Sequence, residues 1–507
     1  MGDPERLYDV AVIGGGINGA GIACDAAGRG LSVLLLEAGD LGGGTSSAST
    51  KLIHGGLRYL EYMEFRLVRE ALKEREILLA KAPHLVWPMR FVVPHCAAMR
   101  PWPLVRLGLF LYDHLAPRHR IPGSSGIDLA TDPAGAPLRD EYRRGFTYWD
   151  CWADDARLVV LNARAAAQAG ASVRTRTRCL SARREDGRWS VAWRDESSGA
   201  TGVATARALV NAAGPWVGQV ANRTETGHGR PPGTSVRLVK GSHIVVPRIP
   251  GTEGAESAYL LQNDDRRVVF ILPFEHDLSL VGTTDVPFAG DASECRIDAD
   301  EIDYLLEATG RYLKRPLNRD EVLWSFSGVR PLFDDEATAA QAVTRDYRLQ
   351  LDGADGAAPL LTVLGGKLTT YRRLAEEALE RLAPCLQFPA GPWTANATLP
   401  GGDIPRGDSA AWVAELQRRR SGFARDFLAR LAARHGTLVD QVLGDARDLG
   451  DLGEHVGGDL YEREVRHFAE HEWAREPDDV LWRRTKTGVH LPPERRAQAA
   501  ETIARML

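Results

Sequence analysis

The chain has 507 residues, 44% of them hydrophobic and 26% charged, and its 63 basic and 68 acidic residues leave a formal net charge of -5. This composition excludes an intrinsically disordered or collagen-like chain, and the near balance of charge argues against a nucleic-acid-binding protein, so no nucleic-acid partner is expected. The length predicts roughly two to four domains at ~150 residues each, and the 51 glycines exceed the share of an average chain.

Cysteine usage indicates a reducing, cytoplasmic environment. The six cysteines are far apart and form no C-x-x-C motif, which argues against a disulfide scaffold and a zinc site, and no metal is expected. Residues 1–7 carry two acidic side chains and lead into a strand, so no signal peptide is predicted. No stretch of ~18 uncharged apolar residues is present, so no membrane-spanning helix is expected.

Residues 7–37 predict a strand, a glycine-rich turn, a helix and a second strand. The two apolar runs are typical of parallel strands that are covered on both faces. Between them, Gly14-x-Gly16-x-x-Gly19 fits a turn whose backbone approaches a pyrophosphate at a helix N-terminus. Glu37 ends the second strand, where a carboxylate can accept hydrogen bonds from ribose hydroxyls. The pattern predicts a dinucleotide-binding unit, and a purely structural glycine turn is the alternative.

This fingerprint fits NAD and FAD equally, and the next segment favours FAD. Residues 42–51, GGGTSSASTK, follow the second strand directly and offer backbone N–H groups and hydroxyls that can wrap a long ligand. A flexible linker is the alternative, and it is disfavoured because the mixed sequence LIHGGLRYLE follows immediately. A charged amphipathic helix is then predicted over residues 61–82.

Residues 102–119, WPLVRLGLFLYDHLAPRH, are apolar and aromatic, with four arginines in and around them. One interpretation is an interfacial segment that docks on anionic lipid. The other is an ordinary buried helix with a basic end, and composition alone favours this second interpretation.

The later part of the chain alternates between strand and helix patterns. Strands are predicted within residues 171–211 and 236–290, and a helix over 300–315. Residues 208–216 predict a strand followed by a turn of small residues, which would allow the chain to pass beneath the adenine half of FAD. The Gly-Gly turn in 361–372 opens a helix whose N-terminus could stabilise a reduced flavin, which again favours FAD. Residues 393–507, after a linker rich in proline and glycine, predict a separate helical domain.

Three polar clusters predict a site for a small anionic substrate. They are His54–Tyr59, Ser327–Pro331 and Lys240–His243. Arginine is suited to bidentate binding of phosphate, so Arg330, between glycine and proline, is a candidate. A single arginine is more often structural, and gathering Arg58, Arg330 and Lys367 in one site would favour the phosphate interpretation instead.

Taken together, the motifs resemble one known family, the bacterial aerobic glycerol-3-phosphate dehydrogenases, which are FAD-dependent and quinone-linked. The matching segments are IGGGINGAGIACDAAGRGLSVLLLE, TSSASTKLIHGGLRYLE, DDARLV, KGSHIVVP, VGTTD, SGVRPL, LGGKLTTYR, DLGEHVG and PDDVLWRRTK. The resemblance implies an α/β fold, α+β overall, in which a Rossmann-like FAD-binding domain is interleaved with a β-sheet substrate domain and followed by a C-terminal α-helical domain. The expected bounds are 1–85, 150–220 and 340–388 for the first, 86–149 and 221–339 for the second, and 393–507 for the third.

The resemblance further implies oxidation of sn-glycerol 3-phosphate to dihydroxyacetone phosphate, by hydride transfer from C2 to flavin N5. Electrons then pass to ubiquinone or menaquinone at the cytoplasmic face of the membrane, to which the protein attaches peripherally. A homodimer is expected. Two alternatives remain: an FAD-dependent amine or amino-acid oxidase of the same fold, and a non-catalytic flavin-bound scaffold protein.

The expected catalytic residues are His243 as general base, His54 as the alternative base, and Arg330 beside the developing alkoxide. Substrate is expected to contact Arg58, Tyr59, Arg330, Lys367 and Thr370. The residues expected to contact FAD are Gly14, Gly16, Ile17, Asn18, Gly19, Glu37, Ala38, Thr45, Ser46, Ser47, Ser49, Lys51, Leu52, His54, Gly56, Cys179, Ala213, Gly214, Gly366, Lys367, Leu368 and Thr369.

Overall fold

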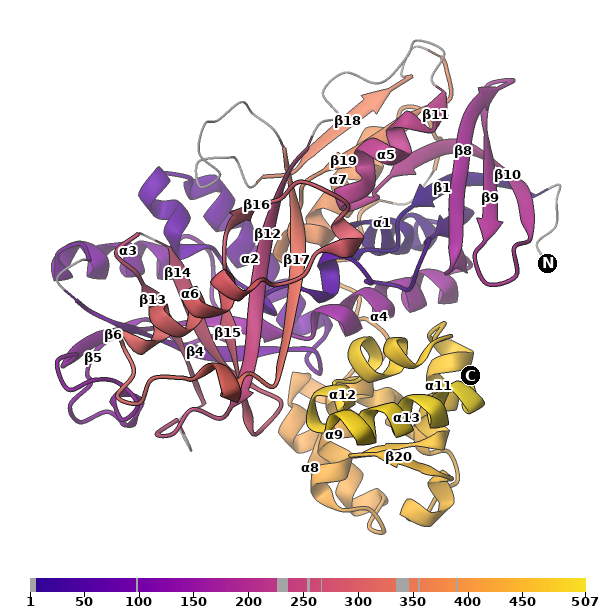
Figure 1. Cartoon of the computed structure of the whole chain (residues 1–507). Helices are drawn as coiled ribbons and strands as arrows, with labels where there is room; N and C mark the ends of the chain where they lie inside the picture. Colours follow the sequence, from indigo (N-terminus) through magenta and orange to yellow (C-terminus); the bar gives the residue numbers. More distant parts are fainter. Residues whose placement is uncertain are drawn as a thin grey trace.

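The computed structural model describes residues 6–96, 99–225, 236–252, 256–265, 267–333, 346–353, 356–388 and 391–507, apart from the side chain of Arg58. Two mixed β-sheets with helices packed on them form the larger part of the molecule, and the C-terminal helices form a separate cluster beneath both sheets (Figure 1). The fold class predicted from the sequence is confirmed.

The first sheet has nine strands and is built around β1 (Leu7–Ile13). β1 lies parallel to β2 (Val33–Leu36) and to β10 (Thr201–Asn211). This parallel centre explains why β1 and β2 are continuous apolar runs, since both faces of the strands are covered. The remaining strands are β7 (Ser172–Arg174), β8 (Thr177–Glu185), β9 (Arg188–Asp195), β11 (Thr224–Glu225), β18 (Arg348–Asp352) and β19 (Leu360–Leu364).

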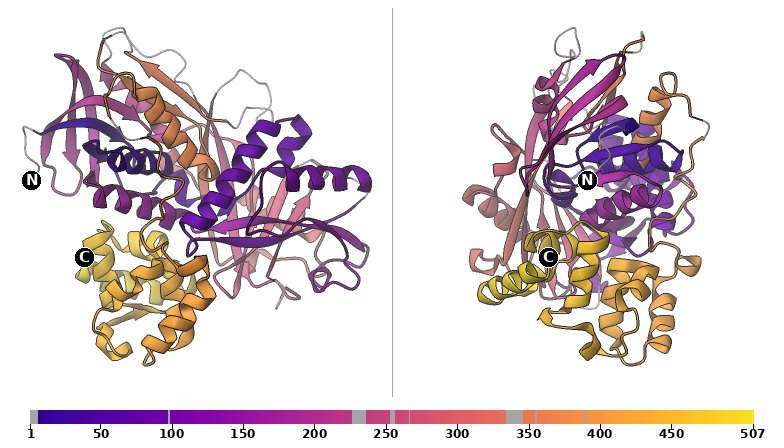
Figure 2. Two further views of the ribbon diagram at one scale, coloured as in Figure 1. Left: turned by 180° about the vertical axis from the view of Figure 1, so that it is seen from behind. Right: turned by 90° about the vertical axis from the view of Figure 1, so that its right-hand side faces the viewer.

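Three helices pack together against this sheet and share one hydrophobic core with it. They are α1 (Ile17–Gly28), α4 (Asp155–Gln168) and α7 (Tyr371–Leu382). α1 consists largely of alanine, glycine and other small residues, which lets the neighbouring helices approach closely. α5 (Val217–Asn222) is a short helix that follows β10. The view from behind shows these helices together over the sheet (Figure 2).

The second sheet has ten strands and carries helices on both faces. Along β4 (Val86–Pro94), Phe91 and Val93 contribute to the core under α2 (Phe65–Lys81) and α3 (Trp102–His114), whereas Val92 contributes to the core under α6 (Ala299–Gly310). This alternation is the period of two of a strand covered on both faces. The other strands are β3 (Leu52–Ile53), β5 (Ser125–Asp128), β6 (Arg144–Ala153), β12 (Val236–Pro247), β13 (Ser257–Gln262), β14 (Val268–Phe274), β15 (Leu278–Gly282), β16 (Val286–Pro287) and β17 (Trp324–Phe333).

The C-terminal domain is helical, with one short two-stranded sheet that the sequence did not predict. Its elements are α8 (Ser409–Arg419), α9 (Arg425–His435), α10 (Val439–Leu443), β20 (His455–Gly457), β21 (Leu460–Tyr461), α11 (Glu462–His471), α12 (Thr487–His490) and α13 (Pro493–Met506). Two hydrophobic cores of its own, one around Leu428 and one around Phe468, hold these helices together.

Two predicted helices have different bounds in the structure. The helix expected over 61–82 begins only at Phe65, because Met63 adopts a left-handed conformation with φ of 60° and ends the preceding 3₁₀ turn, Leu57–Tyr62. The helix expected over 300–315 ends earlier, at Gly310. The expected domain bounds remain predictions, and β3, which falls within 1–85, pairs with β6 in the second sheet.

Candidate functional site

A cavity of about 840 Å³ opens where the parallel strands of the first sheet end. Its walls come from the turn after β1, the loop after β2, the turn after β10 and the turn before α7. Ligands of open α/β sheets bind outside the carboxyl ends of the strands, so this position is the expected one for a dinucleotide.

The glycine turn after β1 forms one wall and cannot accommodate side chains. Gly14 has φ of +108°, and a Cβ atom there would lie 2.6 Å from the Ala212 carbonyl oxygen. At Gly19 a Cβ atom would lie 1.8 Å from the Gly14 oxygen. Gly16 is the N-cap of α1 and has no side chain to cover the first N–H groups of the helix. The turn therefore brings bare backbone and a helix N-terminus to the cavity, as an anionic pyrophosphate requires.

Glu37 is held at the edge of the cavity by two backbone hydrogen bonds. Gly15 N–H donates to Oε2 at 2.6 Å, and Gly39 N–H donates to Oε1 at 2.7 Å. Burial raises the pKa of Glu37 despite these two hydrogen bonds, which favour its charged form. The carboxylate has a fixed orientation, and its remaining lone pairs can accept hydrogen bonds from ribose hydroxyls.

Asn18 joins the first turn to the turn before α7. Its Nδ2 donates to the Gly365 oxygen at 3.1 Å, and a Cβ atom at Gly366, where φ is +100°, would lie 2.7 Å from that same Nδ2. Asn18 Oδ1 is buried and has no hydrogen-bond partner among the described residues. A buried acceptor left open in this way fits a bound ligand that donates to it, so the cavity fits FAD on its own geometry.

The structure brings most of the expected cofactor residues to this one cavity. Those that line it are Gly14, Gly16, Ile17, Asn18, Glu37, Ala38, Thr45, Ser46, Ser49, Cys179, Ala213, Gly214, Gly366 and Leu368. The others lie outside its lining and are Gly19, Ser47, Lys51, Leu52, His54, Gly56, Lys367 and Thr369. The contact of either group with FAD remains a prediction.

The side chain of Lys51 is not part of the cavity lining. Its Nζ donates to Asp155 Oδ1 at 2.7 Å and to the Ser47 oxygen at 3.2 Å. Asp155 also accepts from the Ser49 hydroxyl at 2.8 Å. The two side chains fasten the loop after β2 to the start of α4, so Lys51 acts on the cavity wall through this loop. Sequence reasoning assigned no role to Asp155, although the motif DDARLV contains it.

His243, on β12, is buried beside the cavity-forming loop. Its ring stacks on Phe326 with centroids 4.8 Å apart, and Nε2 lies 3.0 Å from Thr50 Oγ1. Nδ1 is buried and has no partner among the described residues. Burial, followed by the charges of Arg330 and Lys51, lowers the pKa of His243 well below its ordinary value. The imidazole is therefore neutral near pH 7.

Arg330 lies on β17, the strand that pairs with the strand of His243. One guanidinium nitrogen donates to Asp285 Oδ1 at 2.6 Å and the other to Thr283 Oγ1 at 3.0 Å. Its side chain is 28% exposed, so the group is oriented without being enclosed. Thr283 and Asp285 belong to the motif VGTTD, and the sequence alone did not show that they orient an arginine.

The remaining expected substrate residues gather near the start of α7. Lys367 Nζ lies 4.3 Å from the centroid of the Tyr59 ring, which is within the range of a cation–π interaction. The His54 N–H donates to Thr369 Oγ1 at 3.3 Å. Thr370 follows Thr369 in the sequence and is buried. The side chain of Arg58 lies outside the described residues, so its predicted role stays a prediction.

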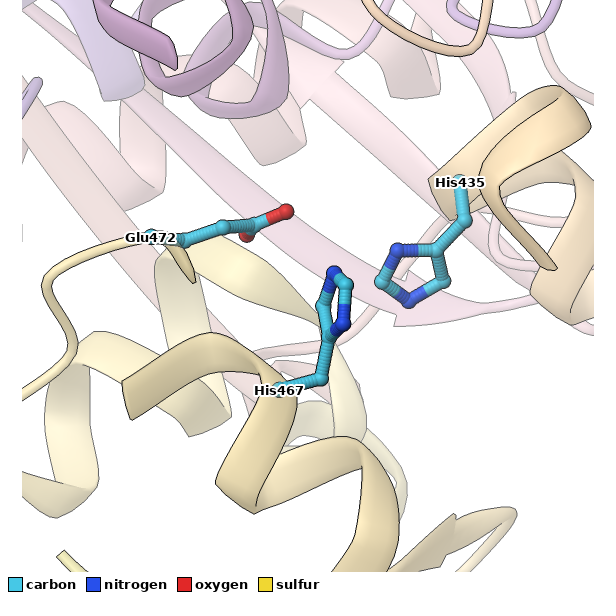
Figure 3. A group of neighbouring side chains, drawn as sticks. All are labelled: His435, His467 and Glu472. Carbon is cyan, nitrogen blue, oxygen red and sulfur yellow. The ribbon is translucent and has the colours of Figure 1, made fainter. Parts of the chain in front are cut away.

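One cluster in the described residues has the composition of a metal site. His435, His467 and Glu472 offer ligand atoms within 4.8 Å of one another (Figure 3). Arg157 donates to both carboxylate oxygens of Glu472, and Arg164 donates to His467 Nε2 at 3.1 Å. Two guanidinium groups already neutralise the carboxylate and would repel a further cation. The cluster therefore fits an ion-pair network between α4 and the C-terminal domain.

The helix α3 is not the buried helix that composition favoured. Its buried residues are Leu109, Tyr112 and Asp113, whereas its large exposed residues are Leu104, Leu107, Phe110 and Leu111. This apolar row faces solvent, so α3 is not an ordinary buried helix. Within the described ranges, no helix has the length and apolar content needed to cross a bilayer.

Two family descriptions match the chain. The first, FAD dependent oxidoreductase, matches residues 9–372. The second, C-terminal domain of alpha-glycerophosphate oxidase, matches residues 392–507. Together they cover the two sheets and the helical domain.

Individual relatives are similar over the whole chain. A D-erythritol 1-phosphate dehydrogenase of Brucella abortus (strain 2308) is 52% identical over 501 residues, 99% of this chain and 98% of the relative. An aerobic glycerol-3-phosphate dehydrogenase of Escherichia coli (strain K12) is 51% identical over 496 residues, 98% and 97% of the two chains. A solved structure of the glycerol-3-phosphate dehydrogenase from Bacillus halodurans complexed with FAD has a TM-score of 0.75 at 27% identity, covering 99% of this chain and 95% of that one.

Proposed function

Because the chain belongs to the FAD-dependent oxidoreductase family, and within it to the group that includes the aerobic glycerol-3-phosphate dehydrogenases, we propose that it oxidises sn-glycerol 3-phosphate to dihydroxyacetone phosphate. The resemblance read from the sequence motifs and the predicted cofactor are thereby confirmed. The observation that carries the proposal is a cavity whose walls fit FAD and whose lining includes Pro331 and Gly366, the sequence neighbours of Arg330 and Lys367.

FAD, when bound, supplies the acceptor for the two electrons and the hydrogen that leave C2 of the substrate. The chain supplies binding and proton transfer. Arg330 and Lys367 are cations that can neutralise the phosphate, and Tyr59 and Thr370 can add hydrogen bonds. Arg330 is already oriented by Asp285, so little conformational entropy is lost when an anion binds to it.

His243 is the proposed general base for the C2 hydroxyl proton. We assign the ring proton to Nε2, which donates it to Thr50 Oγ1, because a proton on Nδ1 would be a buried donor with no acceptor among the described residues. Nδ1 then accepts the substrate proton. His54 is the alternative base, and its backbone bond to Thr369 places it near Lys367.

Electrons are proposed to pass onward to ubiquinone or menaquinone, at a membrane on whose cytoplasmic face a homodimer of the protein is attached peripherally. The quinone, the homodimer and the compartment rest on the family resemblance. The peripheral attachment has structural support as well, because four apolar side chains of α3 are exposed in a row near several arginines.

This attachment predicts that Leu107→Gln combined with Phe110→Gln weakens vesicle binding at least tenfold. The two side chains are 53% and 48% exposed. About half of each side chain can therefore enter lipid, so removing it from lipid costs about 1 kcal/mol, half the free energy of burying the whole side chain. Co-sedimentation with vesicles of anionic lipid measures the effect. Val203→Gln is the matched control, because Val203 is 56% exposed on β10 and distant from α3 in the sequence. Equal binding by both variants would contradict attachment through α3.

A second candidate substrate is D-erythritol 1-phosphate, because the relative from Brucella abortus is named for its dehydrogenation. Both compounds carry a secondary alcohol next to the carbon that bears the phosphate, so the same cations and the same base can serve either. They differ in one additional hydroxymethylene group.

Anaerobic titration of the holoenzyme with each compound tests the proposed function. Addition of sn-glycerol 3-phosphate should bleach the visible absorbance of the flavin at a lower concentration than D-erythritol 1-phosphate does. The reverse order would assign the second substrate. Failure of both compounds to bleach the flavin, with peroxide formed from glycine or sarcosine in air, would indicate the alternative amine oxidase, and failure of all four would indicate the non-catalytic scaffold.

A further inference from the structure

Residues 479–486 of the C-terminal domain pack against both sheets, and the proposed reaction uses none of them. Asp479–Arg484 form a single π-helical turn, a geometry found preferentially at functional positions. Trp482 of this turn stacks on Trp324 of β17, with ring centroids 4.7 Å apart. The next two side chains, Arg483 and Arg484, contact the loop after β2, which belongs to the first sheet. Figure 1 shows the C-terminal domain at this position, beneath both sheets.

The two arginines meet at one buried carboxylate, that of Asp40. Arg483 Nε donates to Oδ2 at 2.5 Å. Arg484 is completely buried and donates to both carboxylate oxygens, with 2.8 Å to Oδ1. Burial alone would raise the pKa of Asp40, but the guanidinium groups hold it below its ordinary value. The C-terminal domain thus supplies the counter-charge for a carboxylate of the cofactor domain.

Asp40 ends the loop that presents Glu37 to the cavity. The Asp40 oxygen accepts from Gly43 N–H at 2.9 Å, and Gly42 N–H donates to the Gly15 oxygen at 3.0 Å. Gly15 N–H in turn donates to the Glu37 carboxylate at 2.6 Å. A displacement of Asp40 would therefore disturb the carboxylate expected to bind the ribose and the glycine turn expected to bind the pyrophosphate.

A third arginine fastens the same loop to the C-terminal domain. Arg176 N–H donates to the Gly39 oxygen at 2.8 Å, and its guanidinium group donates to Asp479 at 3.1 Å. Arg483 also donates to Asp479, at 2.5 Å. Arg176, Arg483 and Asp40 all contribute to the lining of the cavity, so the contact between the domains is also part of its wall.

We propose that Arg483 and Arg484 are positioning residues for FAD, and that the C-terminal domain belongs to the cofactor site. Through Asp40 they hold the loop of Glu37 in the conformation that FAD requires. The contact with Asp40 lies in the cofactor region, so the proposal rests on membership of the FAD-dependent family and is independent of which polyol phosphate is oxidised.

The test is the affinity of the full-length apoprotein for FAD, measured by quenching of flavin fluorescence. Arg484→Met and Asp40→Asn should each raise the Kd for FAD at least tenfold. The double variant should lose little more affinity for FAD than Arg484→Met alone. Both changes remove the same interaction, and the effects of substitutions at residues in contact do not add. Arg484→Lys keeps the charge but not the paired N–H donors, so its Kd for FAD should lie between those of wild type and Arg484→Met.

The matched control is Arg430→Met, which breaks an arginine–carboxylate pair with Asp459 (2.9 Å) inside the C-terminal domain. Its Kd for FAD should stay within twofold of wild type. Thermal unfolding of each apoprotein separates loss of stability from loss of affinity. The proposal is overturned if Arg484→Lys and Asp40→Asn bind FAD as wild type does, or if Arg430→Met weakens FAD binding as much as Arg484→Met.

Discussion

Arg330→Ala is expected to lower kcat/KM for sn-glycerol 3-phosphate by about 10²- to 10⁴-fold while FAD stays bound. The range follows from two hydrogen bonds between a guanidinium group and a phosphate, each worth about 1.5–3 kcal/mol, at about 1.4 kcal/mol per tenfold.

Whether Arg330→Ala changes KM or kcat distinguishes two roles for Arg330. A rise in KM with little change in kcat indicates phosphate binding in the ground state, whereas a fall in kcat indicates stabilisation of the alkoxide. Arg90→Ala is the matched control, since Arg90 lies on the same sheet, pairs with Asp132 at 2.8 Å, and is 26% exposed. An Arg330→Ala enzyme with unchanged KM and kcat would exclude any contact of this arginine with substrate.

His243→Asn is expected to lower kcat by about 10²- to 10⁴-fold, the usual contribution of a general base. Asparagine can still bond to Thr50 but cannot accept a proton at neutral pH. Stopped-flow measurement of flavin reduction isolates this step. His84→Asn is the control, because His84 is also a buried histidine, with its pKa lowered to about 3, and its ring lies beside Gly401 and Gly436. If His54→Asn abolished reduction and His243→Asn did not, the base would be His54.

The same assignment predicts the pH dependence of the wild-type enzyme. The base must be deprotonated to act, and burial together with Arg330 and Lys51 lowers the pKa of His243 well below 6.5. Activity should therefore persist as the pH falls through 6.5 and decline only at lower pH. A kcat/KM profile whose acid limb has its midpoint at 6.5 would indicate an exposed histidine, and thus a base other than His243.

The cofactor region was largely predictable because its determinants are local. A turn that passes Ala212 as closely as Gly14 does requires glycine by steric exclusion, and that requirement appears directly in the sequence. The parallel centre of the first sheet was predictable as well, because the continuous apolar runs of β1 and β2 are also local features of the sequence. The exposure of α3 could not be predicted, because an apolar helix has the same pattern whether a sheet or solvent faces it.

The sequence by itself determined that the chain is an α/β flavoprotein with a helical C-terminal domain, since turn sterics and periodicity act over a few residues. Tertiary structure alone decided which polar groups meet. His243 and Thr50 are 193 residues apart, and Arg484 and Asp40 are 444 apart. Whether such groups pair depends on the docking of whole sheets and domains, because no local property of either residue specifies its partner. The proposed base, the orienting partner of Arg330 and the link from the C-terminal domain to the cofactor loop all arise from that docking.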